Sequence, residues 1–181
     1  MRSPEEHREA IEAYVAELAP TPELGAQADS LRYALTGGKR VRAVICLATA
    51  EAAGAEPDAA LPAAASLELV HAFSLVHDDL PALDNDAERR GRPSTWSQFG
   101  EAVAVLAGDA LLAEAFRLAL SYPTPSAARE LAQATLGMIG GQYLDITGTA
   151  SDEAIEILSE LSEIAKEVES QLQQAKREAE S

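Results

Sequence analysis

Apolar segments alternate with polar breaks rich in Gly and Pro along most of the chain, and this pattern predicts helices joined by turns. No segment has the apolar–polar alternation of a strand, and no repeat of roughly 20–50 residues is visible. The pattern therefore predicts an all-α protein. The expected helices cover residues 4–19, 22–35, 39 or 40–53, 58–80, 98–121 and 126–147.

Two of these segments and one break carry particular signals. Residues 4–19 follow Ser3, a capping residue, and begin with Pro and two acidic residues, as helix N-termini commonly do. Residues 58–80 are apolar on most sides, which predicts a central helix. The stretch NDAERRGRPSTW, residues 85–96, is polar and contains Gly and Pro, so a loop is expected there.

The C-terminal stretch, residues 151–181, contains no Gly, Pro or aromatic residue, and Ser151 can cap a helix. Ten Arg and one Lys precede residue 151, whereas one Arg and two Lys follow it, which suggests a different origin. We interpret 1–150 as one domain and 151–181 as an amphipathic, idealised or grafted helix; an ordinary closing helix is the alternative. Its seam alternates spacings of three and four residues at Leu158, Leu161, Ala165, Val168, Leu172, Ala175 and Ala179.

Composition supports helices and limits the function. Hydrophobic residues make up 47% of the chain and aromatic residues 4%, a balance that favours helices over strands. The net charge of −16 argues against broad nucleic-acid binding. No apolar run of about 20 residues was identified, so no membrane span is expected. The polar N-terminus resembles no secretion signal, and Cys46 in an apolar run predicts a buried thiol, so a cytoplasmic setting is expected.

Four aspartates fall within HDDLPALDND, residues 77–86, directly after the apolar segment. Carboxylates held together repel one another unless cations neutralise them, and Mg²⁺ combines a few carboxylates with water and phosphate oxygens. Asp84 lies six positions beyond Asp78, so it can reach the same site if Leu80 and Pro81 distort the helix. An ordinary solvated acidic loop is the alternative.

Basic residues are concentrated in two clusters, which hold six of the 14 Lys and Arg residues. Arg side chains bind phosphate oxygens in pairs, and Gly37 and Gly38 allow the backbone to approach an anion. Carboxylates that need Mg²⁺ together with two basic clusters predict a diphosphate ligand, although an Arg pair alone is usually only surface. The clusters are Lys39, Arg40, Arg42 and Arg89, Arg90, Arg92.

The stretches GGKRVRA, ELVHAFSLVHDDLPALDNDAERRGRP, AVAVLAGDALLAEAF and MIGGQYLDI resemble the trans-isoprenyl diphosphate synthases, with the bacterial farnesyl/geranyl diphosphate synthase branch nearest. The resemblance covers roughly residues 25–149. It implies an isoprenoid-synthase-type helical bundle, Mg²⁺ as cofactor, and isopentenyl diphosphate and an allylic diphosphate as substrates. In that family an allylic diphosphate ionises with the help of Mg²⁺, the double bond of isopentenyl diphosphate attacks the cation, and a proton is lost.

The resemblance also assigns roles to individual residues. Asp78, Asp79 and Asp84 match the first aspartate-rich motif, in which Asp78 and Asp84 bind Mg²⁺ and Asp79 supports them. Arg89 matches the arginine that holds the allylic diphosphate. Gln142 and Asp145 match a helix that lines the cavity, and Gln142 is expected to bind substrate. The positions matching the isopentenyl diphosphate site, with the adjoining glycine, are Gly38, Lys39, Arg42, His71 and Arg90.

Several of these residues also have plainer interpretations. His71 without the family match would be an ordinary histidine at the edge of the core, and His77 is equally readable as structural. Phe73 and Ser74 lie about one turn before Asp78, where bulk limits product length in this family. Phe73 as plain core packing is an equal alternative.

The chain departs from the family after GQYLDITGT: the second aspartate-rich motif and the Lys-Thr pair before it do not occur. About half the catalytic bundle is therefore expected to be absent, with the extra amphipathic helix closing what is left. Three interpretations follow: a truncated or re-engineered prenyltransferase with weak turnover, an assembly in which a second copy or a partner chain completes the bundle, and a helical scaffold with vestigial chemistry.

Overall fold

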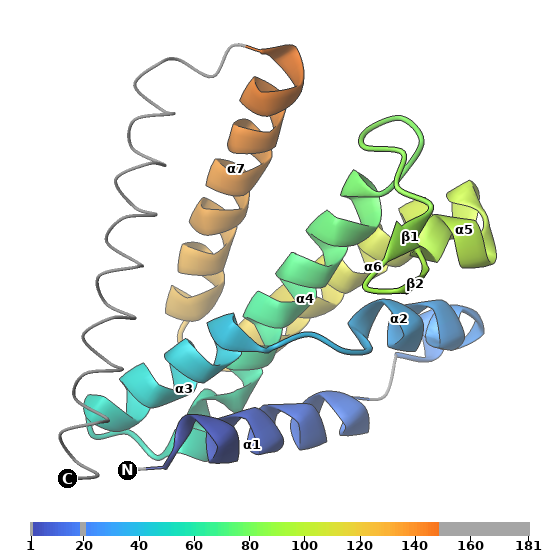
Figure 1. Cartoon of the computed structure of the whole chain (residues 1–181). Helices are drawn as coiled ribbons and strands as arrows, with labels where there is room; N and C mark the ends of the chain where they lie inside the picture. The colour runs from blue at the N-terminus through green and yellow to red at the C-terminus, as the bar shows by residue number, and fades with distance from the viewer. Residues whose placement is uncertain (1, 19–20, 149–181) are drawn as a thin grey trace, which may run out of the picture. The chain divides into compact units, whose positions relative to one another are not determined.

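The computed structural model describes residues 2–18 and 21–148 and divides the chain into two units, Met1–Thr135 and Leu136–Ser181, each described by itself (Figure 1). The prediction of an all-α fold is confirmed. The α-helices are α1 Pro4–Glu17, α2 Ala28–Leu35, α3 Val41–Ala52, α4 Leu61–Asp78, α5 Thr95–Phe99, α6 Glu101–Ala119 and α7 Ser126–Thr147. Two 3₁₀ helices, η1 Pro22–Gln27 and η2 Pro57–Ala60, and two short strands, β1 Glu88–Arg89 and β2 Arg92–Pro93, complete the described elements.

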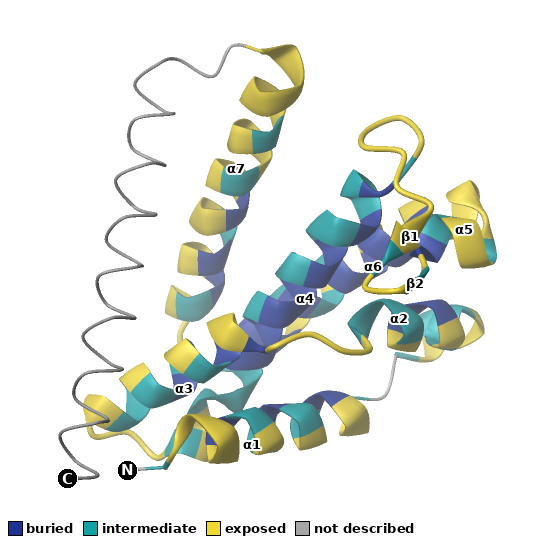
Figure 2. Cartoon of the chain, viewed as in Figure 1, coloured by how far each residue is buried: buried dark blue, intermediate teal, exposed yellow. Residues whose placement is uncertain are grey.

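Helix α4 is the core of the first unit and packs mainly against α6 and α3 (Figure 2). Small residues on α6 let the two helices approach closely, and Gly108 is the clearest case. A Cβ at Gly108 would lie 2.2 Å from Nε2 of His77 on α4, so a side chain there would displace the His77 ring. The same nitrogen lies 3.0 Å from the Val105 carbonyl oxygen. His77 therefore joins α4 to α6, in line with the structural interpretation.

The predicted helix positions are close to those observed, with differences at the starts of some helices. Ser3 and Glu6 form the expected capping box at the start of α1. The single helix expected over 22–35 is instead a 3₁₀ helix followed by α2, and η2 likewise precedes α4.

The loop expected over residues 85–96 was incorrect in two respects, because α5 already begins at Thr95 and because the stretch contains the antiparallel hairpin β1–β2. Arg90 and Gly91 form its two-residue turn with φ of 56° and 76°, the left-handed conformation that such turns require. Strands of two residues are too short to produce an alternating pattern, which is why the sequence did not indicate them.

The expectation that no segment is long and apolar enough to cross a membrane was also wrong. Residues 57–78 form 22 helical residues, and an 18-residue window within them has a mean hydropathy of 1.5, so the stretch meets that test by length and composition. Half of that window is buried within the protein. The core helix of a folded bundle has these same properties, and α4 packs against α3 and α6 as such a helix. The predicted helix over 151–181 lies outside the described residues.

Candidate functional site

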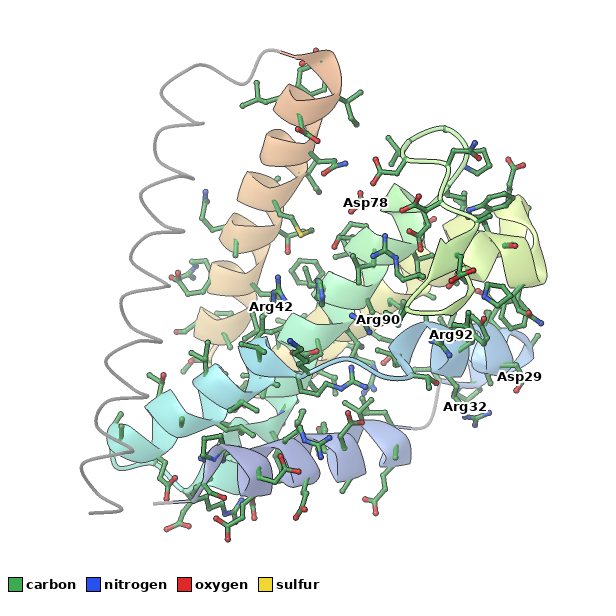
Figure 3. All side chains as sticks on the ribbon, viewed as in Figure 1. Asp29, Arg32, Arg42, Asp78, Arg90 and Arg92 are labelled. Carbon is green, nitrogen blue, oxygen red and sulfur yellow. The ribbon has the colours of Figure 1, made fainter. Side chains whose placement is uncertain are left out.

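A cavity of about 510 Å³ lies between the loop that joins α2 to α3, the first turn of α3, the middle of α4 and the hairpin turn. Five predicted ligand residues line it together, although they come from three separate segments of the chain. These are Gly38, Lys39, Arg42, His71 and Arg90. We call this space the diphosphate cavity. Arg42 and Arg90 are labelled in Figure 3, as is Asp78 at the end of α4.

The α2–α3 loop needs its two glycines for different reasons. Gly37 and Gly38 have φ of 81° and 105°, which lets the chain reverse before α3 begins. Around Gly37 a Cβ would meet nothing within 4 Å, whereas at Gly38 it would lie 2.9 Å from Nη1 of Arg90. Gly38 therefore leaves room for the Arg90 guanidinium against the loop.

The hairpin that carries Arg90 is fixed to α2. Nη2 of Arg92 donates to the Tyr33 carbonyl at 2.7 Å and to the Thr36 carbonyl at 3.0 Å, and its guanidinium lies 4.2 Å from the centre of the Tyr33 ring. The Tyr33 hydroxyl donates to the Pro93 carbonyl at 2.6 Å. Arg92 is thus an anchor, and among the three arginines of its cluster only Arg90 lines the diphosphate cavity.

His71 is half-buried in this basic environment. Burial is the main cause that lowers the pKa of His71, and the positive charge of Arg42 lowers it further, while Glu68 acts in the opposite direction. The imidazole is therefore neutral around pH 7 and can hydrogen-bond a phosphate oxygen without carrying charge.

The aspartate motif folds back on itself where α4 ends. The Asp84 amide donates to the Asp78 carbonyl at 2.9 Å, and the Asp86 amide to the Asp79 carbonyl at 3.1 Å. The predicted distortion after Asp79 is thus present, and it returns Asp84 to Asp78. Burial raises the pKa of Asp78, and the neighbouring Asp84 carboxylate raises it further.

Asp79 and Arg89 are held together inside the protein. Nε of Arg89 lies 2.8 Å from both carboxylate oxygens of Asp79, which is 2% exposed. The hydrogen bonds that Arg89 donates to the Asp79 carboxylate are the main cause that raises the pKa of Arg89. Asp79 therefore orients Arg89, whereas its predicted support of the metal ligands Asp78 and Asp84 stays a prediction. Arg89 adjoins the diphosphate cavity from a separate small space of about 30 Å³.

Metal binding can be judged from the carboxylates. Within residues 2–18 and 21–148, no group of three or more His, Cys, Asp or Glu side chains is placed to hold a metal ion. Asp78 and Asp84 nevertheless form a close pair whose mutual repulsion a cation would relieve. Two carboxylates suit Mg²⁺, which completes its shell with water and phosphate oxygens. The pair fits part of a magnesium site.

The remaining predicted residues lie elsewhere. Phe73 is buried, and its ring packs edge to face against the His77 ring with 5.1 Å between the ring centres, which agrees with core packing. The Ser74 hydroxyl donates to the His71 carbonyl at 3.0 Å. Gln142 is half-buried and Asp145 exposed on the part of α7 that belongs to the second unit. A chain-length role for Phe73 and Ser74 and a ligand role for Gln142 stay predictions.

Sequence reasoning missed Glu68, and it assigned Arg40 only to a basic cluster. Both line the diphosphate cavity and both are buried. Arg40 has a left-handed backbone, φ 51°, and its guanidinium is bound within the protein. The available signal was a lone charge in the apolar run LPAAASLELVHAF, because a buried carboxylate needs a partner.

The fold is that of the isoprenoid synthases. An isoprenoid synthase family member from Thermotoga neapolitana superimposes with a TM-score of 0.74 at 35% identity, covering 78% of this chain and 56% of that one. The geranylgeranyl pyrophosphate synthetase of Geoglobus acetivorans gives 0.73 at 36% identity, covering 82% and 50%. The chain belongs to the polyprenyl synthetase family, whose sequence model matches residues 26–171.

Curated relatives are similar over the same region. The geranylgeranyl diphosphate synthase of Cyanophora paradoxa is 45% identical over 142 residues, which are 72% of this chain and 47% of the relative. The farnesyl diphosphate synthase of Geobacillus stearothermophilus is 43% identical over 130 residues, 66% and 44% respectively. The chain thus spans less than half the length of these relatives. The family match also continues past residue 150, the domain boundary that we predicted, and that boundary stays a prediction.

Proposed function

We propose that this chain carries two parts of a short-chain prenyl diphosphate synthase. One is the isopentenyl diphosphate site, and the other is the part of the allylic diphosphate site that the first aspartate-rich motif forms. The observation that supports the proposal most strongly is the diphosphate cavity, in which five predicted ligand residues from three separate segments of the chain meet. The proposed reaction condenses an allylic diphosphate, dimethylallyl or geranyl, with isopentenyl diphosphate to a short-chain isoprenyl diphosphate, geranyl from the first and farnesyl from the second.

The residues divide the work by charge. Lys39, Arg42 and Arg90 neutralise the isopentenyl diphosphate, and neutral His71 adds a hydrogen bond to it without further charge. Arg89, oriented by Asp79, faces the allylic diphosphate and stabilises the charge that develops as this group leaves. Asp78 and Asp84 would hold Mg²⁺, which when bound supplies further neutralisation of the leaving diphosphate.

A second candidate is a helical module that binds diphosphate but turns over only when another chain completes the bundle. Among the relatives, the heterodimeric geranylgeranyl pyrophosphate synthase large subunit 1 of Arabidopsis thaliana is 46% identical over 136 residues. Val105 and Leu106 on α6 are 40% and 54% exposed, and apolar residues on a surface favour association. A homodimer or a heterodimer is therefore proposed as the active assembly. A cytoplasmic setting is proposed separately, from the sequence.

Prenyl transfer with labelled isopentenyl diphosphate and Mg²⁺, beside Asp78→Ala, tests the first candidate. Turnover that Asp78→Ala abolishes supports it. Calorimetric titration with isopentenyl diphosphate and light scattering separate the remaining cases. Binding without turnover favours the module, and turnover that rises with protein concentration as the dimer forms favours the assembly. The absence of both turnover and diphosphate binding would contradict both candidates.

A further inference from the structure

Glu68 presents a puzzle in the diphosphate cavity. The cavity is lined by Lys39, Arg42 and Arg90, as a site for an anion should be, yet the Glu68 carboxylate also lines it. A carboxylate at this place repels a diphosphate. Its side chain is 5% exposed, so it is not simply solvated.

Both oxygens of Glu68 are occupied by groups of the α3 N-terminus. One oxygen accepts a hydrogen bond from the Ala43 amide at 3.1 Å. The other lies 3.5 Å from Nη1 of Arg40. Helix α3 has no side-chain cap of its own, because Arg40 occupies the N-cap position. Glu68 on α4 therefore caps α3 from another helix.

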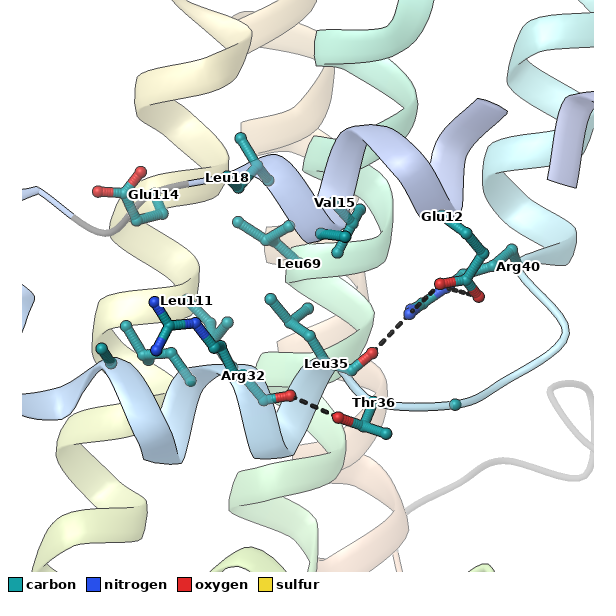
Figure 4. A pocket seen from close by; sticks show the side chains of 14 residues that line it. Glu12, Val15, Leu18, Arg32, Leu35, Thr36, Arg40, Leu69, Leu111 and Glu114 are labelled. Atoms are coloured by element: carbon teal, nitrogen blue, oxygen red, sulfur yellow. Dashed lines mark hydrogen bonds and ion pairs between the residues drawn. The ribbon is translucent and has the colours of Figure 1, made fainter. Parts of the chain in front are cut away.

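Arg40 extends this contact to α1 and α2. Its Nε lies 2.9 Å from Glu12, and its Nη2 donates to the Leu35 carbonyl at 2.5 Å (Figure 4). A buried guanidinium held by two carboxylates and a carbonyl fixes the chain on both sides of Lys39. The segment from Leu35 to Ala43 is thus tied at both ends.

We propose that Glu68 is a positioning residue of the diphosphate cavity, which fixes the start of α3 through Ala43 and Arg40 so that Lys39 and Arg42 meet the ligand. The inference rests on the proposed function, because it assigns the cavity to a diphosphate. Its physical content is that a negative charge inside an anion site strengthens binding by holding the cations in place.

The test compares Glu68→Met with Glu12→Gln by calorimetric titration with isopentenyl diphosphate. Glu68→Met removes the charge and the acceptor at similar length, and we expect affinity to fall about tenfold, as when groups that orient a ligand-binding side chain are lost. Glu12→Gln weakens the other carboxylate contact of Arg40 but keeps the contact of Glu68 with Ala43, does not line the cavity, and should lower affinity by much less than Glu68→Met does. Glu68→Gln keeps an acceptor for Ala43 and should restore part of the affinity.

The opposite outcome is informative. If Glu68 is only a nearby negative charge, Glu68→Met tightens binding; if it only balances Arg40, Glu12→Gln weakens binding equally. Either result overturns the inference.

A measurement without ligand separates this inference from the proposed function. Amide hydrogen exchange at Ala43 should accelerate in Glu68→Met and stay slow in Glu68→Gln and Glu12→Gln. Unchanged protection in Glu68→Met overturns the positioning role. If the unaltered chain does not bind isopentenyl diphosphate, the proposed function fails, while the exchange experiment still decides the role of Glu68.

Discussion

The candidate ligand residues on and beside α4 lie at two places that carry opposite charge. Basic side chains gather near His71, and carboxylates gather at Asp78. Around His71, Lys39, Arg42 and Arg90 line a space, and the buried Arg40 beside them is bound by Glu12 and Glu68. At Asp78, burial raises the pKa of the carboxyl group, and the neighbouring Asp84 carboxylate raises it further. The basic end therefore suits an anion and contains one carboxylate of its own, Glu68, whereas the acidic end suits a cation.

The largest expected effect is at the acidic end. Asp78→Asn should reduce prenyl transfer by at least about 10²-fold, a loss typical of removing groups that stabilise transition-state charge. The variant should keep its far-UV circular dichroism and its affinity for isopentenyl diphosphate, because the diphosphate cavity does not depend on Asp78. A parallel loss of isopentenyl diphosphate binding would mean that the two ends are not independent.

The adjacent residues Arg89 and Arg90 should differ in how much each contributes to the free energy of unfolding. Arg89→Ala leaves the buried Asp79 carboxylate unpaired and should lower the free energy of unfolding by about 3 kcal/mol, at the lower end for broken buried pairs because Arg89 is partly exposed. Arg90→Ala should change stability by less than about 0.5 kcal/mol, as surface substitutions do.

Urea unfolding measures both variants, and a titration with isopentenyl diphosphate should show the reverse order, with Arg90→Ala the weaker binder. Equal stability losses would contradict the division between a buried pair and a ligand-facing arginine.

A finer test uses the two glycines. Gly38→Ala and Gly37→Ala both place an L-residue at positive φ, so each should cost about 1 kcal/mol of folding free energy. Only the Gly38 variant brings a Cβ within 2.9 Å of Arg90, and only it should weaken binding of isopentenyl diphosphate several-fold. Calorimetry on the pair checks this, and equal affinities would exclude the close approach.

The smallest effect is a pKa change at Asp78. Because its folded-state pKa is raised, ionised Asp78 destabilises the fold, and this cost is relieved as pH falls through the raised pKa. Asp84→Asn removes one of the causes, so the pKa of Asp78 should fall but stay above its usual range, since burial persists. Carbon-13 NMR of the carboxyl groups measures the shift. No change on substitution of Asp84 would show that the two carboxylates do not interact.

The helices, and the set of candidate residues that meet at one cavity, were predictable because they depend on local pattern and on motifs. Ser3, a capping residue, predicted the start of α1. The motifs around Lys39, His71 and Arg90 indicated residues that the fold brings to one cavity. Contacts between distant segments were not predictable. Glu68 caps a helix that begins 27 positions earlier, at Val41, and no local signal in the sequence identifies that partner.

The hairpin that carries Arg90 has a consequence for the order of folding. Arg92 is joined to Tyr33 across 59 positions of sequence, so the cavity closes only after a long loop has closed. The packing of α4 against α6 can begin with a shorter loop, because His77 and Val105 are only 28 positions apart. In refolding from urea, helical circular dichroism should therefore recover before the capacity to bind isopentenyl diphosphate. The chain would pass through a stage in which it is folded but unable to bind its ligand.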